Sequence, residues 1–242
     1  MQIVQTFHYP IFSQSLSDID IEGSKKLIQT INAYSYVMAE RTPQFKQALQ
    51  NADILIPDGF PIVLAAKLLK KQKIQKIAGA DLFFHFMNIL NNSNGRVFFI
   101  GSTEATLAKI QERAAQEFPN IHVATYSPPY KPKFTIEDSE KMTQAINAHN
   151  PDVVFVGMTA PKQEMWAEEH KHDIHAHTIC SIGAVFDFYA GTVQRAPQWM
   201  IQLKLEWFYR LIKEPKRMWK RYLVYSPLFF WDLFLYWIGV KK

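Results

Sequence analysis

The chain alternates short, almost entirely apolar runs with segments of helical periodicity, and this alternation limits the folds that it can adopt. Several runs have the length and composition of buried strands. They are Lys26–Ile31, Ile54–Pro57, Val97–Ile100, Ile121–Tyr126, Val153–Gly157 and Thr178–Ile182. Thr42–Asn51, Thr103–Glu117 and Ile136–Ala148 carry apolar residues at helical spacing between them. Such strands are typical of a mostly parallel sheet with helices on both faces. We therefore predict an α/β, Rossmann-like fold whose functional site follows the carboxyl ends of the strands.

The C-terminal residues differ from the rest of the chain in charge and in aromatic content. Residues 195–242 hold ten Lys and Arg against three acidic side chains, a net +7, whereas residues 1–194 have a net −2, which together give the chain its +5. Five of the six Trp also lie in this stretch. We therefore predict an α/β body, residues 1–194, and a basic, aromatic, helical appendage, residues 195–242.

The appendage is predicted to lie on a membrane surface rather than to cross a membrane. Tyr222–Val240 is strongly apolar, but Pro227 and Asp232 interrupt it, and a spanning helix needs about 20 apolar residues. Trp and Tyr favour the headgroup region, and Lys and Arg are attracted to anionic lipids. The alternatives are a buried helix with a solvated basic face and a tail that binds single-stranded nucleic acid. The content of Trp, Leu and Ile favours lipid, so we expect no nucleic-acid partner.

Asp58 is a candidate general base. It follows the apolar run Ile54–Pro57 and precedes Gly59, so its carboxylate is expected at the carboxyl edge of the sheet, where partial burial tunes its pKa. The alternative is that Asp58 caps the helix expected from Phe60. The local sequence does not distinguish these two roles.

Further junctions between a strand and a helix carry glycine or polar side chains. Gly101 ends one apolar run, and the free N–H groups of the helix after it would suit a phosphate. Gln163 is expected in the first turn of a helix, within reach of a sugar hydroxyl or a phosphate. Asp187 could accept a hydrogen bond from a ribose or a base, although each of the three could equally serve as a turn or cap residue. Because such junctions meet at one edge of a parallel sheet, we expect a shared substrate site there.

The sequence predicts no cofactor and no metal. It lacks the GxGxxG and GxxxxGK[ST] patterns of dinucleotide and P-loop sites. Asp18 and Asp20 have the spacing DxD, and histidines cluster in HKHDIHAH, but solvated surface groups explain both more simply than metal ligands do. Cys180 is the only cysteine, which excludes an internal disulfide and suits a reducing compartment.

Longer motifs then occur together and in one order. They are TINAYS at Thr30–Ser35, PDG at Pro57–Gly59, KIAGADL at Lys76–Leu82, APKQEMW at Ala160–Trp166, GAVFDFYAG at Gly183–Gly191, and RAPQW with LEWFYRLIKEPKRMWKRYL between Arg195 and Leu223. With these motifs, roughly residues 26 to 223 closely resemble the WecG/TagA/CpsF family of bacterial glycosyltransferases.

The resemblance implies an inverting hexosyltransferase that uses no metal. Its donor would be a UDP-sugar, often UDP-N-acetylmannosamine or the related uronic acid. Its acceptor would be a sugar on a polyprenyl diphosphate, commonly N-acetylglucosamine, in the synthesis of a cell-surface polysaccharide or teichoic acid. We expect a peripheral protein on the cytoplasmic face of the bacterial cytoplasmic membrane, and the start MQIVQTFHYP has no secretory signal.

The resemblance also assigns residues. The general base falls on Asp58, with Thr30 and Gln163 as further catalytic positions. The motifs and the junctions above give these substrate-binding positions: Asn32, Lys76, Gly101, Asp187, Arg195, Arg210, Arg217 and Lys220. Lys76 and Lys220 stand where arginine is usual in the family, so charge is retained but a bidentate contact with a diphosphate is lost.

Two other functions stay open. A soluble enzyme that modifies a nucleotide-sugar, such as an epimerase, could use the same sheet, although the missing GxGxxG argues against an NAD-dependent version. A non-catalytic peripheral membrane scaffold could bind a nucleotide-sugar or a transferase partner. Self-association into a homo-oligomer, through the surface of the body that the appendage would cover, is also open.

Overall fold

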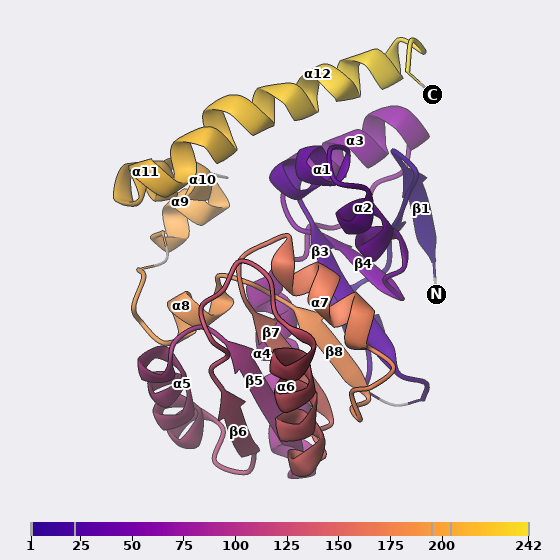
Figure 1. The fold of residues 1–242 in the computed structure, drawn as a ribbon. Coiled ribbons are helices and arrows are strands. Elements are labelled where there is room, and N and C mark those ends of the chain that lie inside the picture. Colours follow the sequence, from indigo (N-terminus) through magenta and orange to yellow (C-terminus); the bar gives the residue numbers. More distant parts are fainter. Residues whose placement is uncertain (1, 22, 195, 204, 242) are drawn as a thin grey trace.

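The computed structural model describes residues 2–21, 23–194, 196–203 and 205–241 (Figure 1). Its eight-stranded sheet has the order β1-β2-β4-β3-β8-β7-β5-β6. The strands are β1 (Ile3–Thr6), β2 (Tyr9–Phe12), β3 (Lys26–Ile31), β4 (Ile54–Pro57), β5 (Arg96–Gly101), β6 (His122–Tyr126), β7 (Val153–Gly157) and β8 (Thr178–Ser181). The first two pair antiparallel, and every other pairing among the described strands is parallel. The predicted mostly parallel α/β sheet is confirmed.

Helices cover both faces of the sheet (Figure 1). One face packs against α4 (Gly79–Ser93), α5 (Glu104–Glu117) and α8 (Val185–Tyr189). The other packs against α1 (Ala33–Ala39), α2 (Pro43–Gln50), α3 (Phe60–Lys70), α6 (Ile136–His149) and α7 (Lys162–His170). Successive residues of β5 show why both faces must be covered. Val97 and Phe99 pack on the α4 side, whereas Phe98 and Ile100 pack on the α6 side, and all four are buried.

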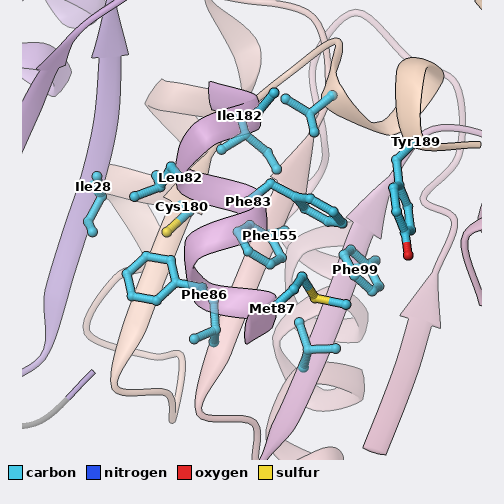
Figure 2. Packing of buried hydrophobic residues seen from close by; sticks show 14 of the residues in the cluster. Ile28, Leu82, Phe83, Phe86, Met87, Phe99, Phe155, Cys180, Ile182 and Tyr189 are labelled. Atoms are coloured by element: carbon cyan, nitrogen blue, oxygen red, sulfur yellow. The ribbon is translucent and has the colours of Figure 1, made fainter. Parts of the chain in front are cut away.

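Figure 2 shows the aromatic core between α4 and the centre of the sheet. Phe83 of α4 lies 5.2 Å, centroid to centroid, from Phe155 of β7, and Phe155 stacks on Phe99 of β5 at 5.6 Å. Each fully buried aromatic or large aliphatic side chain contributes about 1.5–3 kcal/mol relative to exposure. This packing fixes how β5, β7 and β8 are aligned along the strand direction, and therefore where their carboxyl ends lie.

The β1–β2 hairpin is the part of the sheet that the sequence analysis did not predict. Its two-residue turn consists of Phe7 and His8, both with positive φ, at 53° and 70°. Two-residue hairpins need this left-handed backbone, but they normally signal it with Asn or Gly. The predicted strands are otherwise confirmed to within a residue at their ends, and so are the predicted helices that became α2, α5 and α6. The burial predicted for Ile121–Tyr126 is wrong for β6, which is an edge strand with no fully buried residue.

The appendage is helical. Its elements are α9 (Gln198–Gln202), α10 (Glu206–Lys213), α11 (Pro215–Trp219), a π-helical turn (Lys220–Tyr225) and α12 (Ser226–Trp237). Figure 1 shows α11, the π turn and α12 as one long helix that passes above α1 and α3. Pro227 explains the π turn, since proline supplies no N–H and its ring clashes with the carbonyl of Leu223, four residues earlier.

The two faces of α12 differ. Phe229 and Leu233 are buried in the cluster that also holds Tyr36 of α1 and Ile62 of α3. Trp231, on another face of the same helix, is 59 % exposed. In the described part of the chain, no helix is both long enough and apolar enough to cross a membrane. Part of the appendage is therefore packed on the body, and its other face presents large apolar side chains to the surroundings.

Candidate active site

The predicted base lies where β3 and β4 end side by side. β4 places Asp58 directly after Pro57, and the Asp58 N–H donates to the carbonyl of Ile31 at 2.9 Å, which continues the ladder past the last strand residues. Thr30 of β3 is paired with Ile56 of β4 and is almost fully buried. Asn32 follows β3 and begins α1, where its Oδ1 accepts from the Ser35 N–H at 3.1 Å. The structure therefore brings Thr30, Asn32 and Asp58 to one edge, as predicted.

Asp58 does not cap the helix that follows it. Helix α3 starts at Phe60, its N-cap is Gly59, and no side chain caps it. Gly59 has φ 121°, a conformation that residues with a side chain rarely adopt, and it turns the chain between Asp58 and the helix. The carboxylate is thereby released from the usual local role of aspartate at a helix start. The sequence left two roles open for Asp58, and the structure excludes that of helix cap.

The surroundings of Asp58 tune its ionisation. Burial raises the pKa of the Asp58 carboxyl, while the positive charges of Lys76 and Arg221 oppose this rise. Glu206 and Asp81 raise the same pKa to a smaller extent. Lys76 itself is exposed at the rim of this region. A partly buried carboxyl at the end of a strand, with cations acting on it, has the surroundings expected of a general base.

Gln163 lies at the start of α7 with its amide bonded inside the protein. Its Oε1 accepts from the Met158 N–H at 3.2 Å, and its Nε2 donates to Glu164 Oε1 at 2.8 Å. The Gln163 amide also packs beside the Cα of Gly183, whose φ is 57°. Gln163 therefore links the carboxyl ends of β7 and β8, and its predicted contact with substrate stays a prediction.

Asp187 of α8 meets the appendage. Its Oδ2 lies 3.9 Å from Arg217 Nη1, and the same guanidinium nitrogen contacts Glu214 at 2.9 Å. Burial raises the pKa of Asp187, Arg217 and Arg210 oppose this rise, and Glu214 adds to it. Arg210 lies over the ring of Phe188 at 5.4 Å. The predicted positions Asp187, Arg210 and Arg217 are therefore neighbours.

A cation of the appendage that acts on the pKa of Asp58 was not among the predicted site residues. Arg221 lies over the Tyr34 ring of α1, with its guanidinium carbon 5.1 Å from the ring centroid, and it acts on the pKa of Asp58. Lys220, the predicted position, is exposed and lies near the Trp219 ring at 5.6 Å. A contact of Lys220 with substrate stays a prediction.

Gly101 has a clear packing role. A Cβ built on it would lie 2.4 Å from the carbonyl oxygen of Gly157, its partner on β7, so only glycine fits there. The next residues are also engaged locally, since Thr103 Oγ1 caps α5 by accepting from the Thr106 N–H at 3.2 Å. A phosphate contact at Gly101 stays a prediction, and Arg195 lies outside the described residues.

The acidic pair and the histidine cluster have surface partners. Asp20 pairs with Lys26, Asp18 accepts from the Ser15 N–H at 2.9 Å, and His170 lies 3.3 Å from Asp173. In the part of the chain that the structure describes, no group of three or more His, Cys, Asp or Glu side chains is arranged to hold a metal ion.

Comparisons with known proteins bear directly on this site. A family model described as "Glycosyl transferase WecG/TagA/CpsF family" matches residues 6–242. The chain belongs to this family of glycosyl transferases. Over 196 residues it is 35 % identical to the N-acetylglucosaminyldiphosphoundecaprenol N-acetyl-beta-D-mannosaminyltransferase of Bacillus spizizenii, covering 81 % of this chain and 74 % of the relative. The enzyme of the same name in Bacillus subtilis is 33 % identical over 197 residues, covering 81 % and 75 %.

The match covers more of this glycosyl transferase than the motifs did. The motifs spanned residues 26 to 223, whereas the family model begins at residue 6, within β1, and reaches the end of the appendage. The family match therefore includes β2 and α12, which the motifs did not cover.

Sequence reasoning missed Glu164 and Arg221. Glu164 is 2 % exposed, and burial raises its pKa to about 7. Arg221 directly follows Lys220, which is also basic, and the packing of the helix on the body is what distinguishes the two. Glu164 was missed because its burial depends on contacts distant in sequence, such as the hydrogen bond from Gln29 Nε2 to its carbonyl.

Proposed function

We propose that this glycosyl transferase moves N-acetylmannosamine, or a related hexose or uronic acid, from a UDP-sugar to a polyprenyl-diphosphate-linked N-acetylglucosamine. The names of the Bacillus relatives support the sugar and the lipid-linked acceptor. One observation supports the assignment of the base. The partly buried carboxyl of Asp58 lies at the carboxyl edge of the sheet and does not cap a helix, and the charges of Lys76 and Arg221 oppose the rise that burial causes in its pKa.

The reaction is a single displacement with inversion. The Asp58 carboxylate removes the proton of the acceptor hydroxyl while that oxygen attacks the anomeric carbon of the donor sugar. A bond forms between this oxygen and the anomeric carbon, and the bond from the anomeric carbon to the UDP oxygen breaks. The proton stays on Asp58 and the electron pair leaves with UDP. Thr30 and Asn32, at the same edge, would orient the reacting hydroxyl.

The leaving UDP gains negative charge that the protein must stabilise. Arg210 and Arg217 of the appendage, beside Asp187, are the cations proposed for this role, together with Lys76, Lys220 and Arg195 at positions that the motifs assign. Asp187 would accept a hydrogen bond from the nucleotide. Fixed positive charge in a partly desolvated site lowers the barrier most when it is aimed at the leaving group. No cofactor is needed for this step.

We further propose that the appendage binds the cytoplasmic face of the bacterial cytoplasmic membrane, where the acceptor lies. Its exposed large apolar side chains are Trp199, Leu203, Trp207, Phe208, Ile212, Trp219, Leu223, Val224, Phe230, Trp231, Phe234, Trp237, Ile238 and Val240. Exposed aromatic and aliphatic side chains on a segment that also carries basic side chains fit the interface of an anionic bilayer. Synthesis of a cell-surface polysaccharide or teichoic acid is the proposed setting.

A transfer assay tests the proposal. Purified protein is incubated with labelled UDP-N-acetylmannosamine and a short polyprenyl-diphosphate N-acetylglucosamine, and the disaccharide product is quantified. Asp58→Asn keeps the shape of the side chain but cannot accept the proton, so turnover is expected to fall about 1,000-fold. Asp173→Asn, in an aspartate that is 65 % exposed, is the matched control and is expected to retain full turnover.

The same assay separates the alternatives. Near-wild-type turnover in Asp58→Asn would contradict the role of the base. Conversion of the UDP-sugar into another nucleotide-sugar in the absence of acceptor would indicate a nucleotide-sugar-modifying enzyme instead. Binding to liposomes without transfer from any UDP-sugar of a broad panel would indicate a scaffold.

A further inference from the structure

Helix α3 and the segment after it form the most basic stretch of the body. Residues 59–80 hold five lysines and no acidic residue, a net +5, so the rest of the body, whose overall charge is −2, has a net −7. The structure leaves all five lysines exposed: Lys67, Lys70, Lys71, Lys73 and Lys76. The body therefore combines one strongly positive surface segment with an acidic remainder.

Four of these lysines have no charged partner within the protein. In the described part of the chain, no carboxylate lies within ion-pair distance of them, whereas Lys131, also exposed, pairs with Asp138 at 2.9 Å. Like charges without a counter-charge repel one another, and an external anionic surface would relieve that repulsion. We call these four residues the lysine patch: Lys67, Lys70, Lys71 and Lys73.

The helix dipole explains only part of the lysine patch. Positive charge is favourable in the last turn of a helix, and Lys67 and Lys70 lie in the last turn of α3. Lys73 lies two residues beyond the C-cap, Lys71, where the effect of the dipole has fallen off. The patch therefore extends past the point at which it would stabilise its own helix.

The fold holds the lysine patch in a defined place. α3 ends at Lys71, which has φ 55° and whose N–H donates to the carbonyl of Lys67 at 3.1 Å. Beyond the helix, Ile74 is buried in the body, and the Ile77 N–H donates to the carbonyl of Pro57 at 3.2 Å. Buried or hydrogen-bonded residues thus alternate with exposed lysines, and the segment leads from the end of α3 back to the carboxyl end of β4.

The lysine patch adjoins the appendage. Ile62 of α3 shares a buried cluster with Phe229 and Leu233 of α12, and Figure 1 shows α12 passing above α3. Leu68 lies among the lysines of α3 and is exposed, as Trp231 of α12 is. Two adjacent helices therefore expose large apolar side chains, and one of them adds closely spaced lysines. This combination suits the headgroup region of an anionic bilayer.

We propose, building on the membrane association proposed above, that the lysine patch is a second membrane contact, on the body itself, that binds the phosphates of anionic lipid headgroups beside the appendage. The appendage inserts exposed aromatic side chains, whereas the lysines attract the headgroups across the aqueous layer. A single helix on a bilayer leaves the body free to rotate about the helix axis, and a second contact removes that freedom. The carboxyl edge, to which the segment leads, is thereby kept at a set distance from the headgroups.

Vesicle binding by the full chain tests this contact without relying on activity. The triple variant Lys67→Gln, Lys70→Gln, Lys73→Gln removes three charges of the patch and leaves every proposed active-site residue in place. Its affinity for phosphatidylcholine vesicles with about 30 % phosphatidylglycerol is expected to be at least about tenfold weaker than that of wild type at low salt. The difference should shrink as the salt concentration rises, because salt screens the attraction.

The matched control removes three exposed lysines from other parts of the body and therefore has the same net charge. It is expected to stay within about twofold of wild type, because the loss concerns a surface and not the overall charge. The control substitutions are Lys109→Gln, Lys133→Gln and Lys141→Gln.

The acceptor used in the transfer assay gives a second readout. With a water-soluble, short-chain acceptor, the triple patch variant is expected to keep the kcat and KM of wild type. With a long-chain polyprenyl acceptor embedded in anionic vesicles, its KM should rise about tenfold while kcat is unchanged, since only the encounter with the bilayer is weakened. A general loss of stability would affect both acceptors alike and would contradict the proposal.

Wild-type affinity of the triple patch variant for anionic vesicles, or an equal loss in the control, would overturn the second contact. An equal loss on vesicles of phosphatidylcholine alone would also overturn it, because headgroup charge would then not be what is recognised. Loss of binding to single-stranded RNA with vesicle binding unchanged would assign the patch to nucleic acid instead. Trp231→Ala reports on the appendage and Asp58→Asn on the transfer reaction, so each of these proposals can fail without the others.

Discussion

The body and the appendage use their apolar side chains in opposite ways. In the body, strand residues such as Val97 and Phe98 are buried on both faces of the sheet, and the fold holds its carboxyl edge in place. In α12 of the appendage, Phe229 is buried whereas Trp231 is 59 % exposed. The chemistry divides in the same way, since the body carries the proposed base, Asp58, and the appendage carries most of the proposed cations. The packed body holds the proposed proton acceptor at the carboxyl edge of the sheet, and the less completely packed appendage contributes the positive charge.

Apart from the change to the proposed base, loss of a cation from the appendage should have the largest effect on catalysis. Arg210→Ala removes a guanidinium that we propose stabilises the leaving UDP, and kcat/KM is expected to fall about 100-fold in the transfer assay. Lys216→Ala, in an exposed lysine of the same segment, is the matched control and should stay within about twofold of wild type. Equal effects of the two variants would mean that the appendage contributes only its general positive charge.

A pair of substitutions in α12 tests the contrast between its two faces. Phe229→Ala leaves a cavity in the cluster with Tyr36, at a cost of about 3–5 kcal/mol, and should speed hydrogen exchange of α12. Trp231→Ala should change stability by no more than about 0.5 kcal/mol and should instead weaken binding to anionic liposomes. The contrast fails if Trp231→Ala destabilises the protein as much as Phe229→Ala does.

The ionisation of Asp58 gives a smaller, more specific effect. Lys76 opposes the rise that burial causes in the pKa of Asp58, so Lys76→Ala should raise this pKa further. The base works only when ionised, and activity is therefore lost as pH falls through its pKa. In Lys76→Ala the acidic limb of kcat/KM is expected at a higher pH than in wild type, while Lys73→Ala, an exposed neighbour, should leave the limb unmoved. An unmoved limb in Lys76→Ala would contradict the tuning of Asp58 by Lys76.

The fold of the body was largely predictable because its signals are local. The buried strands are short runs rich in apolar residues, such as ILIP in β4, and the junction after β4 indicated Asp58 as a site residue. The two roles of Asp58 were separated only by the backbone of Gly59, which makes Gly59, and not Asp58, the N-cap of α3. The turn at Phe7 and His8 escaped prediction because neither residue type signals a left-handed backbone.

The site residues that were missed depend on contacts distant in sequence. Glu164 of α7 is buried beside β3, and the hydrogen bond from Gln29 to its carbonyl spans 135 residues. Lys220 and Arg221 are adjacent and both basic, and only the packing of the long helix on α1 shows which of them turns toward Tyr34. Charge and spacing identified the helix, but tertiary packing selected the side chain.

The division of roles between body and appendage is tested most directly by the dissociation constant of UDP, measured by calorimetry for wild type, Asp58→Asn and Arg210→Ala. Asp58 acts on the acceptor, so Asp58→Asn should bind UDP as tightly as wild type or more tightly, since a negative charge has been removed. Arg210→Ala should bind UDP at least about tenfold more weakly, because a charge-assisted contact is lost. Equal weakening in both variants, or unchanged binding in Arg210→Ala, would contradict this division of roles.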